Sequence, residues 1–234
     1  MKTHFCRLAR VLFVLTIILP SSIQAATLGF GPTPYLSSAD RPAGIFCESC
    51  PFVLENFEDE TYADSGIAIS GGRILKPFSV SGLDNFVTDS VDADDGTIDG
   101  SGNAGHSWFF AGSSVTITFD NPAKAAGLVW TDGDMASTNV ILSAYDSDLN
   151  LLLSLDAGDL ADDFYTGETA EDSFLGMLSD TGIAQLTIAN TGGGSGIEID
   201  HIQYQTCPEC IPEPGTLVLA CLALVTCLTW LRRV

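Results

Sequence analysis

Hydrophobic and polar residues alternate in short runs through the middle of the chain. In one of them Val115, Ile117 and Phe119 face one way, and the threonines between them face the other. This period of two residues is typical of β-strands with one buried face. Separated by Gly, Asp and Ser, the runs predict strands at Phe52–Phe57, Gly66–Ser70, Asn85–Thr88, Ser107–Ala111, Ser114–Phe119, Ala126–Thr131, Asn139–Tyr145, Leu151–Leu155, Phe174–Leu178, Ile183–Ala189 and Gly196–Tyr204.

The last predicted strand changes phase along its length. Ile197 and Ile199 are followed by Ile202 and Tyr204, which predicts a β-bulge near Asp200 and His201. No helical period is visible between the two ends of the chain. Many short strands at this spacing predict an all-β fold, a single jelly-roll-like β-sandwich over residues 47–210. An extended segment at residues 26–46 is expected to precede it.

The two ends of the chain have the composition of targeting segments. Residues 1–25 combine a basic start, an apolar core and a small-residue site at Ala25, which predicts a signal peptide for the secretory translocon and signal peptidase. An uncleaved anchor is the alternative. Near the other end, the uncharged stretch from Gly215 to Leu231 predicts a transmembrane helix, since about 17 helical residues reach roughly 25 Å. Arg232 and Arg233 behind it should stay cytoplasmic.

Residues 211–234 carry a more specific pattern than an apolar helix alone. Pro212, Glu213 and Pro214 precede the helix, and Arg232 and Arg233 follow it. This arrangement resembles the PEP-CTERM sorting signal of Gram-negative bacteria. The resemblance implies processing near the Pro-Glu-Pro motif by an exosortase, a membrane-embedded cysteine protease. It also implies a transient stay in the inner membrane, followed by the cell surface or extracellular matrix. An ordinary membrane anchor is the alternative.

The charge of the chain is strongly negative. It has 30 acidic and nine basic residues, a net charge of −21. All of the acids, but only Arg41, Arg73, Lys76 and Lys124 among the bases, lie between Ala26 and Pro214. Such a surface repels phosphates, which excludes nucleic acid as a partner. It attracts divalent cations or is simply solvated.

Four cysteines bracket the predicted domain as two pairs, Cys47 with Cys50 and Cys207 with Cys210. In an exported protein such pairs favour disulfides. Two of the three connectivities tie the start of the domain to its end, and closing such a loop is worth about 4–5 kcal/mol. The first and last strands would then be neighbours. A four-thiolate zinc site and a redox-active dithiol are the alternatives.

Two groups of acids suggest calcium. The domain is also similar to jelly-roll carbohydrate-binding modules, and that resemblance implies a structural calcium shared by Glu58, Asp59 and Asp200. The densest acidic stretch does not fit an EF-hand, but its spacing with glycines suits an irregular calcium loop. Its candidate ligands are Asp92, Asp94, Asp95 and Asp99. A solvated acidic loop is the alternative.

Signals for catalysis are sparse. The chain has neither a Gly-x-Ser-x-Gly elbow nor a His-Glu-x-x-His motif. We therefore expect a non-catalytic protein associated with the extracellular polysaccharide or biofilm matrix. One alternative is a glycan-binding module that uses Trp108 and Trp130, since sugar rings stack on exposed aromatic side chains. Another is a glycoside hydrolase, which needs two carboxylates facing each other across a cleft.

Overall fold

The computed structural model describes residues 26–77, 88–94, 96–98, 105–133, 139–160, 169–192 and 196–207. The predicted signal peptide, the tail at residues 211–234 and most of the predicted strand Asn85–Thr88 lie outside these ranges. Within them, no helix has both the length and the apolar character needed to cross a bilayer.

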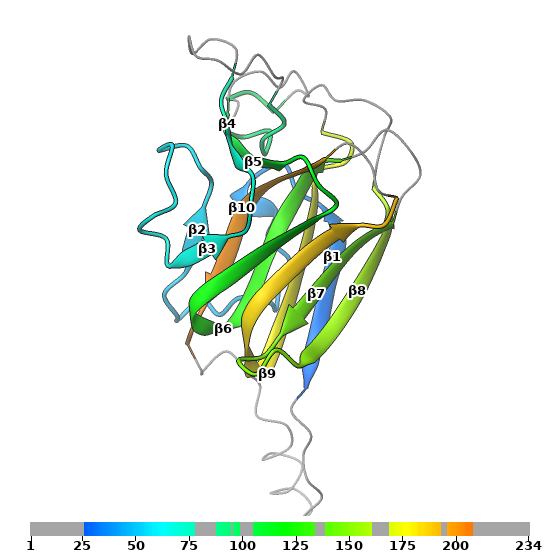
Figure 1. Ribbon diagram of the computed structural model, residues 1–234. Coiled ribbons are helices and arrows are strands. Elements are labelled where there is room, and N and C mark those ends of the chain that lie inside the picture. Colours follow the sequence, from blue (N-terminus) through cyan, green and yellow to red (C-terminus); the bar gives the residue numbers. More distant parts are fainter. Residues whose placement is uncertain are drawn as a thin grey trace, which may run out of the picture.

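The described chain is all-β, as predicted. Its strands form one antiparallel sheet in the order β4-β5-β10-β6-β9-β7-β8, with β1 on β9, β2 on β10 and β3 on β6 (Figure 1). The elements are β1 (Thr27–Pro34), the 3-10 helix η1 (Ser38–Asp40), β2 (Val53–Glu55), β3 (Ile67–Ile69), β4 (Arg73–Leu75), β5 (Ser107–Phe110), β6 (Ser114–Asp132), β7 (Asn139–Tyr145), β8 (Leu151–Asp159), β9 (Ser173–Asn190) and β10 (Ile197–Gln205).

Two long strands, β6 and β9, turn this sheet into a sandwich. The first half of β6 pairs with β3 and the end of β9, whereas its second half pairs with β10 and the start of β9. The register breaks between Thr118 and Ala123, where the sheet folds over. The prediction of two separate strands in each of these regions was wrong. Pro122 and Gly182, the latter at φ +96°, mark a corner between layers and not a reversal of the chain.

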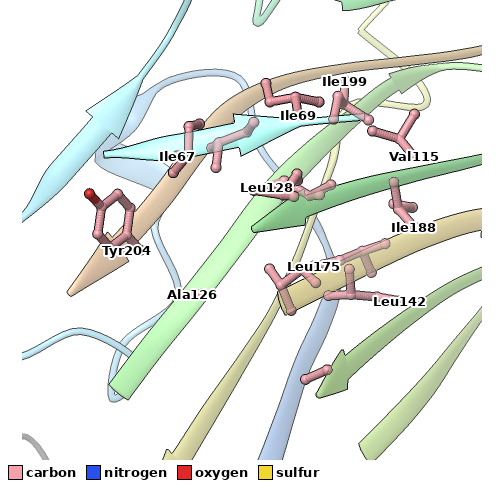
Figure 2. Close-up of a cluster of buried hydrophobic side chains, with 14 of the residues drawn as sticks. Ile67, Ile69, Val115, Ala126, Leu128, Leu142, Leu175, Ile188, Ile199 and Tyr204 are labelled. Atoms are coloured by element: carbon pink, nitrogen blue, oxygen red, sulfur yellow. The ribbon is translucent and has the colours of Figure 1, made fainter. Parts of the chain in front are cut away.

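The main core fills the space between the two layers. Figure 2 shows its aliphatic side chains converging from both layers, with Leu128 and Leu175 from one layer near Leu142 and Ile188 from the other. Trp130 also belongs to this core and is fully buried. Each fully buried aliphatic side chain contributes about 1.5–3 kcal/mol to the stability of the fold. The two layers are therefore held together chiefly by apolar contacts.

A second, smaller core lies on the opposite face of β6 and β9. Val129 and Phe174 point away from the main core because side chains alternate along a strand. They pack under the segments around Tyr35, Ile45 and Val91. This face of the sandwich is therefore covered by irregular chain.

A disulfide between Cys50 and Cys207 joins the two ends of the domain across 157 residues. β2 and β10 are paired beside it, with Glu55 opposite Ile202. The predicted link between the two cysteine pairs is thus confirmed, and the first and last predicted strands are neighbours, as expected. A four-thiolate zinc site is excluded because two of the four sulfurs are joined in the disulfide. The Cys47 sulfur lies 3.1 Å from the Ser49 hydroxyl, and Cys210 is outside the described residues.

The sandwich begins earlier than residue 47. Residues 27–34, which the sequence assigns to a separate extended segment, form β1 and pair with the first half of β9. The strand β4, which was not among the predicted strands, pairs with β5 through Arg73 and Phe109.

Candidate metal centre

β10 carries an unusual row of buried polar side chains. The register with β6 shifts between Asp200 and Gln203, and His201 has a φ of +43°, which confirms the predicted bulge. Glu198 and Asp200 before the bulge, and Gln203 and Gln205 after it, are all buried.

Each of these four side chains binds the chain that covers β10. Glu198 Oε1 accepts a hydrogen bond from the Asp89 N–H at 2.8 Å, and Asp200 Oδ2 accepts one from the Val91 N–H at 2.9 Å. Gln203 donates to the Tyr35 hydroxyl at 2.8 Å. Gln205 accepts from the Cys47 N–H and donates to the carbonyls of Cys47 and Cys50. The row therefore fixes the two covering segments onto the sheet.

Asp94, Asp200 and His201, here called the Asp94 cluster, bring three potential ligand atoms within 4.8 Å of one another. His201 Nε2 lies 2.7 Å from Asp94 Oδ2, and its Nδ1 lies 3.2 Å from the Tyr35 hydroxyl. The Asn56 amide donates to the same Asp94 oxygen at 3.3 Å. Asp200 and His201 are buried and Asp94 is half-buried, so the cluster lies at the edge of the small core.

Burial governs the charges in this cluster. It raises the pKa of Asp200 to about 7, against the opposing effect of the neighbouring His201. Burial lowers the pKa of His201, but Asp200 and Asp94 outweigh it and leave that pKa above its ordinary value. The two carboxylates therefore favour the protonated form of His201. Two carboxylates suit calcium, and a carboxylate with an imidazole suits a transition metal, so the donor set fits a divalent cation.

The predicted calcium ligands separate into different environments. Asp94 and Asp200, predicted for two different sites, meet in one cluster. Glu58 instead binds His106 Nδ1 at 3.0 Å, and Asp59 accepts from the Thr61 N–H in an exposed turn. Asp92 is buried, and Asp95 and Asp99 lie outside the described residues.

His201 was expected only as a bulge residue, and its place beside two acids was missed. A histidine directly after an aspartate in a phase-shifted strand is the signal that could have found it.

Trp108 and Trp130 do not form the predicted sugar platform. Their side chains are 4% and 0% exposed, because both indoles point into the main core. Trp108 packs there against the rings of Phe57 and Tyr62. The alternative of a sugar platform built from these two tryptophans therefore does not fit the structure.

An open pocket of about 580 Å³ lies beside the Cys50–Cys207 disulfide, lined by Arg41, Phe46, Glu48, Phe52 and the residues around them. The Arg41 guanidinium sits 4.3 Å from the centre of the Phe52 ring. Phe46 meets Phe52 edge to face at 5.2 Å. Aromatic and charged groups thus converge on a surface that solvent can reach.

Among solved structures, the described fold is similar to a family 35 carbohydrate binding module from Clostridium thermocellum. The identity is 12%, the TM-score is 0.33, and the match covers 66% of this chain and 97% of the module. It is also similar to the enzymatically active domain of the Bacteriophage CBA120 tailspike protein 4, at 13% identity and a TM-score of 0.29. That match covers 64% of this chain and 20% of the tailspike domain. Matches at this identity and TM-score carry no information on the ligand or the activity of this chain.

No curated protein gives a significant match to the chain. Residues 211–233 match the PEP-CTERM protein-sorting motif, as the sequence pattern indicated. A motif of this kind implies processing by an exosortase and an exported, membrane- or surface-associated protein of a Gram-negative bacterium. The chain thus joins an all-β sandwich to a PEP-CTERM sorting motif.

Proposed function

We propose that the chain is exported, held briefly in the inner membrane, processed by an exosortase near Pro212–Pro214, and then works without catalysis in the extracellular polysaccharide matrix. The observation that carries this proposal is the sorting motif at residues 211–233 behind an exported-type domain. The disulfide between Cys50 and Cys207 supports an oxidising destination.

A non-catalytic role is supported by the burial of the domain's most perturbed acids. Glu198 and Asp200 are 4% and 0% exposed and hydrogen-bond to the covering chain. A glycosidase needs two carboxylates that face a substrate cleft. The open pocket near the disulfide has one carboxylate, Glu48, among its lining residues.

This pocket is our candidate for the contact with polysaccharide. Phe46 and Phe52 offer aromatic surface for sugar C–H groups, while Arg41 and Glu48 offer a donor and an acceptor for hydroxyls. The observation favours glycan binding at this place, in contrast to the buried Trp108 and Trp130.

The test is co-sedimentation of the protein with matrix polysaccharide purified from the producing bacterium, with release of reducing ends measured in the same samples. We expect binding without release, and weaker binding by Phe52→Ala. Tyr145→Ala, a half-buried aromatic on β7 away from the pocket, is the matched control and should bind as the parent does. Release of reducing ends would overturn the non-catalytic role, and equal binding by both variants would overturn the pocket.

We further propose that the Asp94 cluster holds calcium through the carboxylates of Asp94 and Asp200. The proximity of these oxygens supports it, as does the capacity of calcium to neutralise the buried Asp200 and the half-buried Asp94 in place of His201. Asp94→Asn should reduce the rise in melting temperature that calcium produces after chelation. An undiminished rise would contradict this assignment, and a larger rise with zinc would indicate a site that uses His201.

A further inference from the structure

A second group of acids gathers where β6 ends and β9 and β10 begin, at the upper end of the sheet in Figure 1. Asp132 pairs with Glu198 across β6 and β10. Trp130 pairs with Ser173, so Asp172 and Glu171 directly precede the paired part of β9. The Asp89 N–H reaches Glu198 Oε1 at 2.8 Å. We name Asp89, Asp132, Glu171, Asp172 and Glu198 the Asp89 cluster.

Four of these five acids are almost completely withdrawn from water. Asp89, Glu171, Asp172 and Glu198 are each at most 4% exposed. Transferring an ionised carboxylate into such surroundings is costly unless a positive charge or hydrogen bonds compensate it. Several buried acids side by side add mutual repulsion to that cost.

Three buried oxygens at this end also lack hydrogen-bond partners in the part of the chain that the structure describes. They are Asp89 Oδ2 and the hydroxyl oxygens of Thr88 and Thr131. Thr131 directly precedes Asp132 on β6, and Thr88 precedes Asp89. An unsatisfied buried polar atom costs about 1–3 kcal/mol, so three of them together point to a ligand that accepts electron pairs from oxygen.

The electrostatics of Asp89 agree with this geometry. Its pKa is raised well above the ordinary value by burial and then by Asp172, Glu198, Glu171 and Asp132. Glu198 accepts hydrogen bonds from the Asp89 N–H and from the Ser107 hydroxyl, a pattern that suits an ionised carboxylate. A bound cation would compensate the charge of these buried acids.

We propose that the Asp89 cluster is a second cation site, separate from the Asp94 cluster, and that it binds calcium at the carboxylate of Asp89, beside Asp172 and Glu198. The cluster supplies carboxylate and hydroxyl oxygens and neither imidazole nor thiolate. Calcium takes six to eight oxygen ligands of these kinds, whereas zinc prefers nitrogen and sulfur.

The two clusters are joined by residues 88–94. The Asp89 N–H binds Glu198, the Val91 N–H binds Asp200, and Val91 is buried in the small core between them. A cation at each end fixes this irregular segment along β10. Bound calcium therefore holds residues 88–94 against the sandwich, in addition to neutralising the charge of the acids.

The test is calorimetric titration of the chelator-treated full chain in detergent with calcium alone, at physiological salt so that the solvated acids contribute little. We expect Asp89→Asn to lose one tight equivalent of calcium relative to the parent. Asp94→Asn should keep that equivalent, and Asp148→Asn, an exposed acid in a turn, should match the parent. A failure of the Asp94 assignment is thus distinguishable from a failure of this one.

The same variants separate binding from folding. Because Asp89→Asn replaces a buried acid by an amide of the same size that does not ionise, it should melt no lower than the parent in chelator, yet gain less from calcium. Should it fail to fold, Asp172→Asn gives the same comparison from the residue that precedes β9. The proposal is overturned if the parent binds no tight calcium, or if the variant that folds binds as many equivalents as the parent.

Discussion

Glu55 shows how a single buried acid is held by hydrogen bonds in this domain. Its side chain is 7% exposed, and its Oε1 accepts a hydrogen bond from the Phe57 N–H at 2.8 Å. Phe57 has a φ of +58°, a backbone conformation that this bond helps to hold. Burial raises the pKa of Glu55 more than its hydrogen bonds to Phe57 and Ser65 lower it.

Replacing Glu55 by Gln should change how stability depends on pH. The pKa of Glu55 is higher in the folded than in the unfolded state, so the folded state binds the extra proton, and the free energy of unfolding falls as pH rises between the two pKa values. Gln keeps the acceptor for Phe57 and cannot ionise. In urea unfolding, the stability of Glu55→Gln relative to the parent should therefore increase from about pH 4 to about pH 8. A difference that is constant with pH would contradict the assigned cause.

At the scale of single residues, the sequence identifies candidate metal ligands but does not show which of them lie together in the fold. Asp94 was found because acids spaced by small residues and glycines suit a calcium loop, and Asp200 was found through the resemblance to jelly-roll carbohydrate-binding modules. Their meeting depends on residues 88–94 lying along β10, which no local pattern records. Trp108 and Trp130 lie on strands, and alternation alone does not say which face is the core.

At the scale of elements, the sequence predicts β10 and its bulge correctly but does not predict that both faces of this strand are buried. Its alternation and its bulge are visible in the sequence, and alternation ordinarily implies one solvated face. In the structure all nine residues of β10 are buried. The polar face is covered by segments around Tyr35 and Val91, which have no periodicity that would announce their position.

The substitution Gln205→Ala should measure how much the polar face of β10 stabilises the segment that covers it. The change removes the partner of the Cys47 N–H and of the Cys47 and Cys50 carbonyls. Loss of buried partners of this kind costs about 1–3 kcal/mol. We expect a fall of that size in the free energy of unfolding by urea, together with faster amide hydrogen exchange at Cys47.

Gln185→Ala on β9 is the matched control for this substitution. Gln185 is half-buried, and its amide bonds the Thr118 hydroxyl at a long 3.4 Å. Its replacement should change the free energy of unfolding by less than about 0.5 kcal/mol. Equal effects at the two positions would show that the row on β10 has no special role.

At the scale of the whole molecule, the sequence predicts the fold class and the closure of the domain correctly. Short alternating runs indicate a sandwich, and paired cysteines at its two ends indicate a link between first and last strands. The continuity of β6 and β9 was missed because Pro122 and Gly182 resemble signals that end strands. A corner between layers and a reversal of the chain use the same residues, and only packing distinguishes them.

The link between Cys50 and Cys207 should contribute a large share of the stability. Replacing both cysteines by Ala restores the conformational freedom of a long loop in the unfolded chain, which should lower the free energy of unfolding by about 2–5 kcal/mol. Urea unfolding of the parent under reducing conditions should then approach that of the variant. Identical unfolding of the oxidised parent and the variant would show that the bond stabilises nothing.

The most direct test of the account as a whole is the intact mass of the protein recovered from cells with and without an exosortase. With the enzyme, we predict a surface or extracellular protein that lacks residues 1–25 and has lost its tail near Pro212–Pro214. Without it, the protein should remain in the membrane fraction with the tail attached. A protein that keeps residues 211–234 in both strains would contradict the proposed sorting, whatever the sandwich binds.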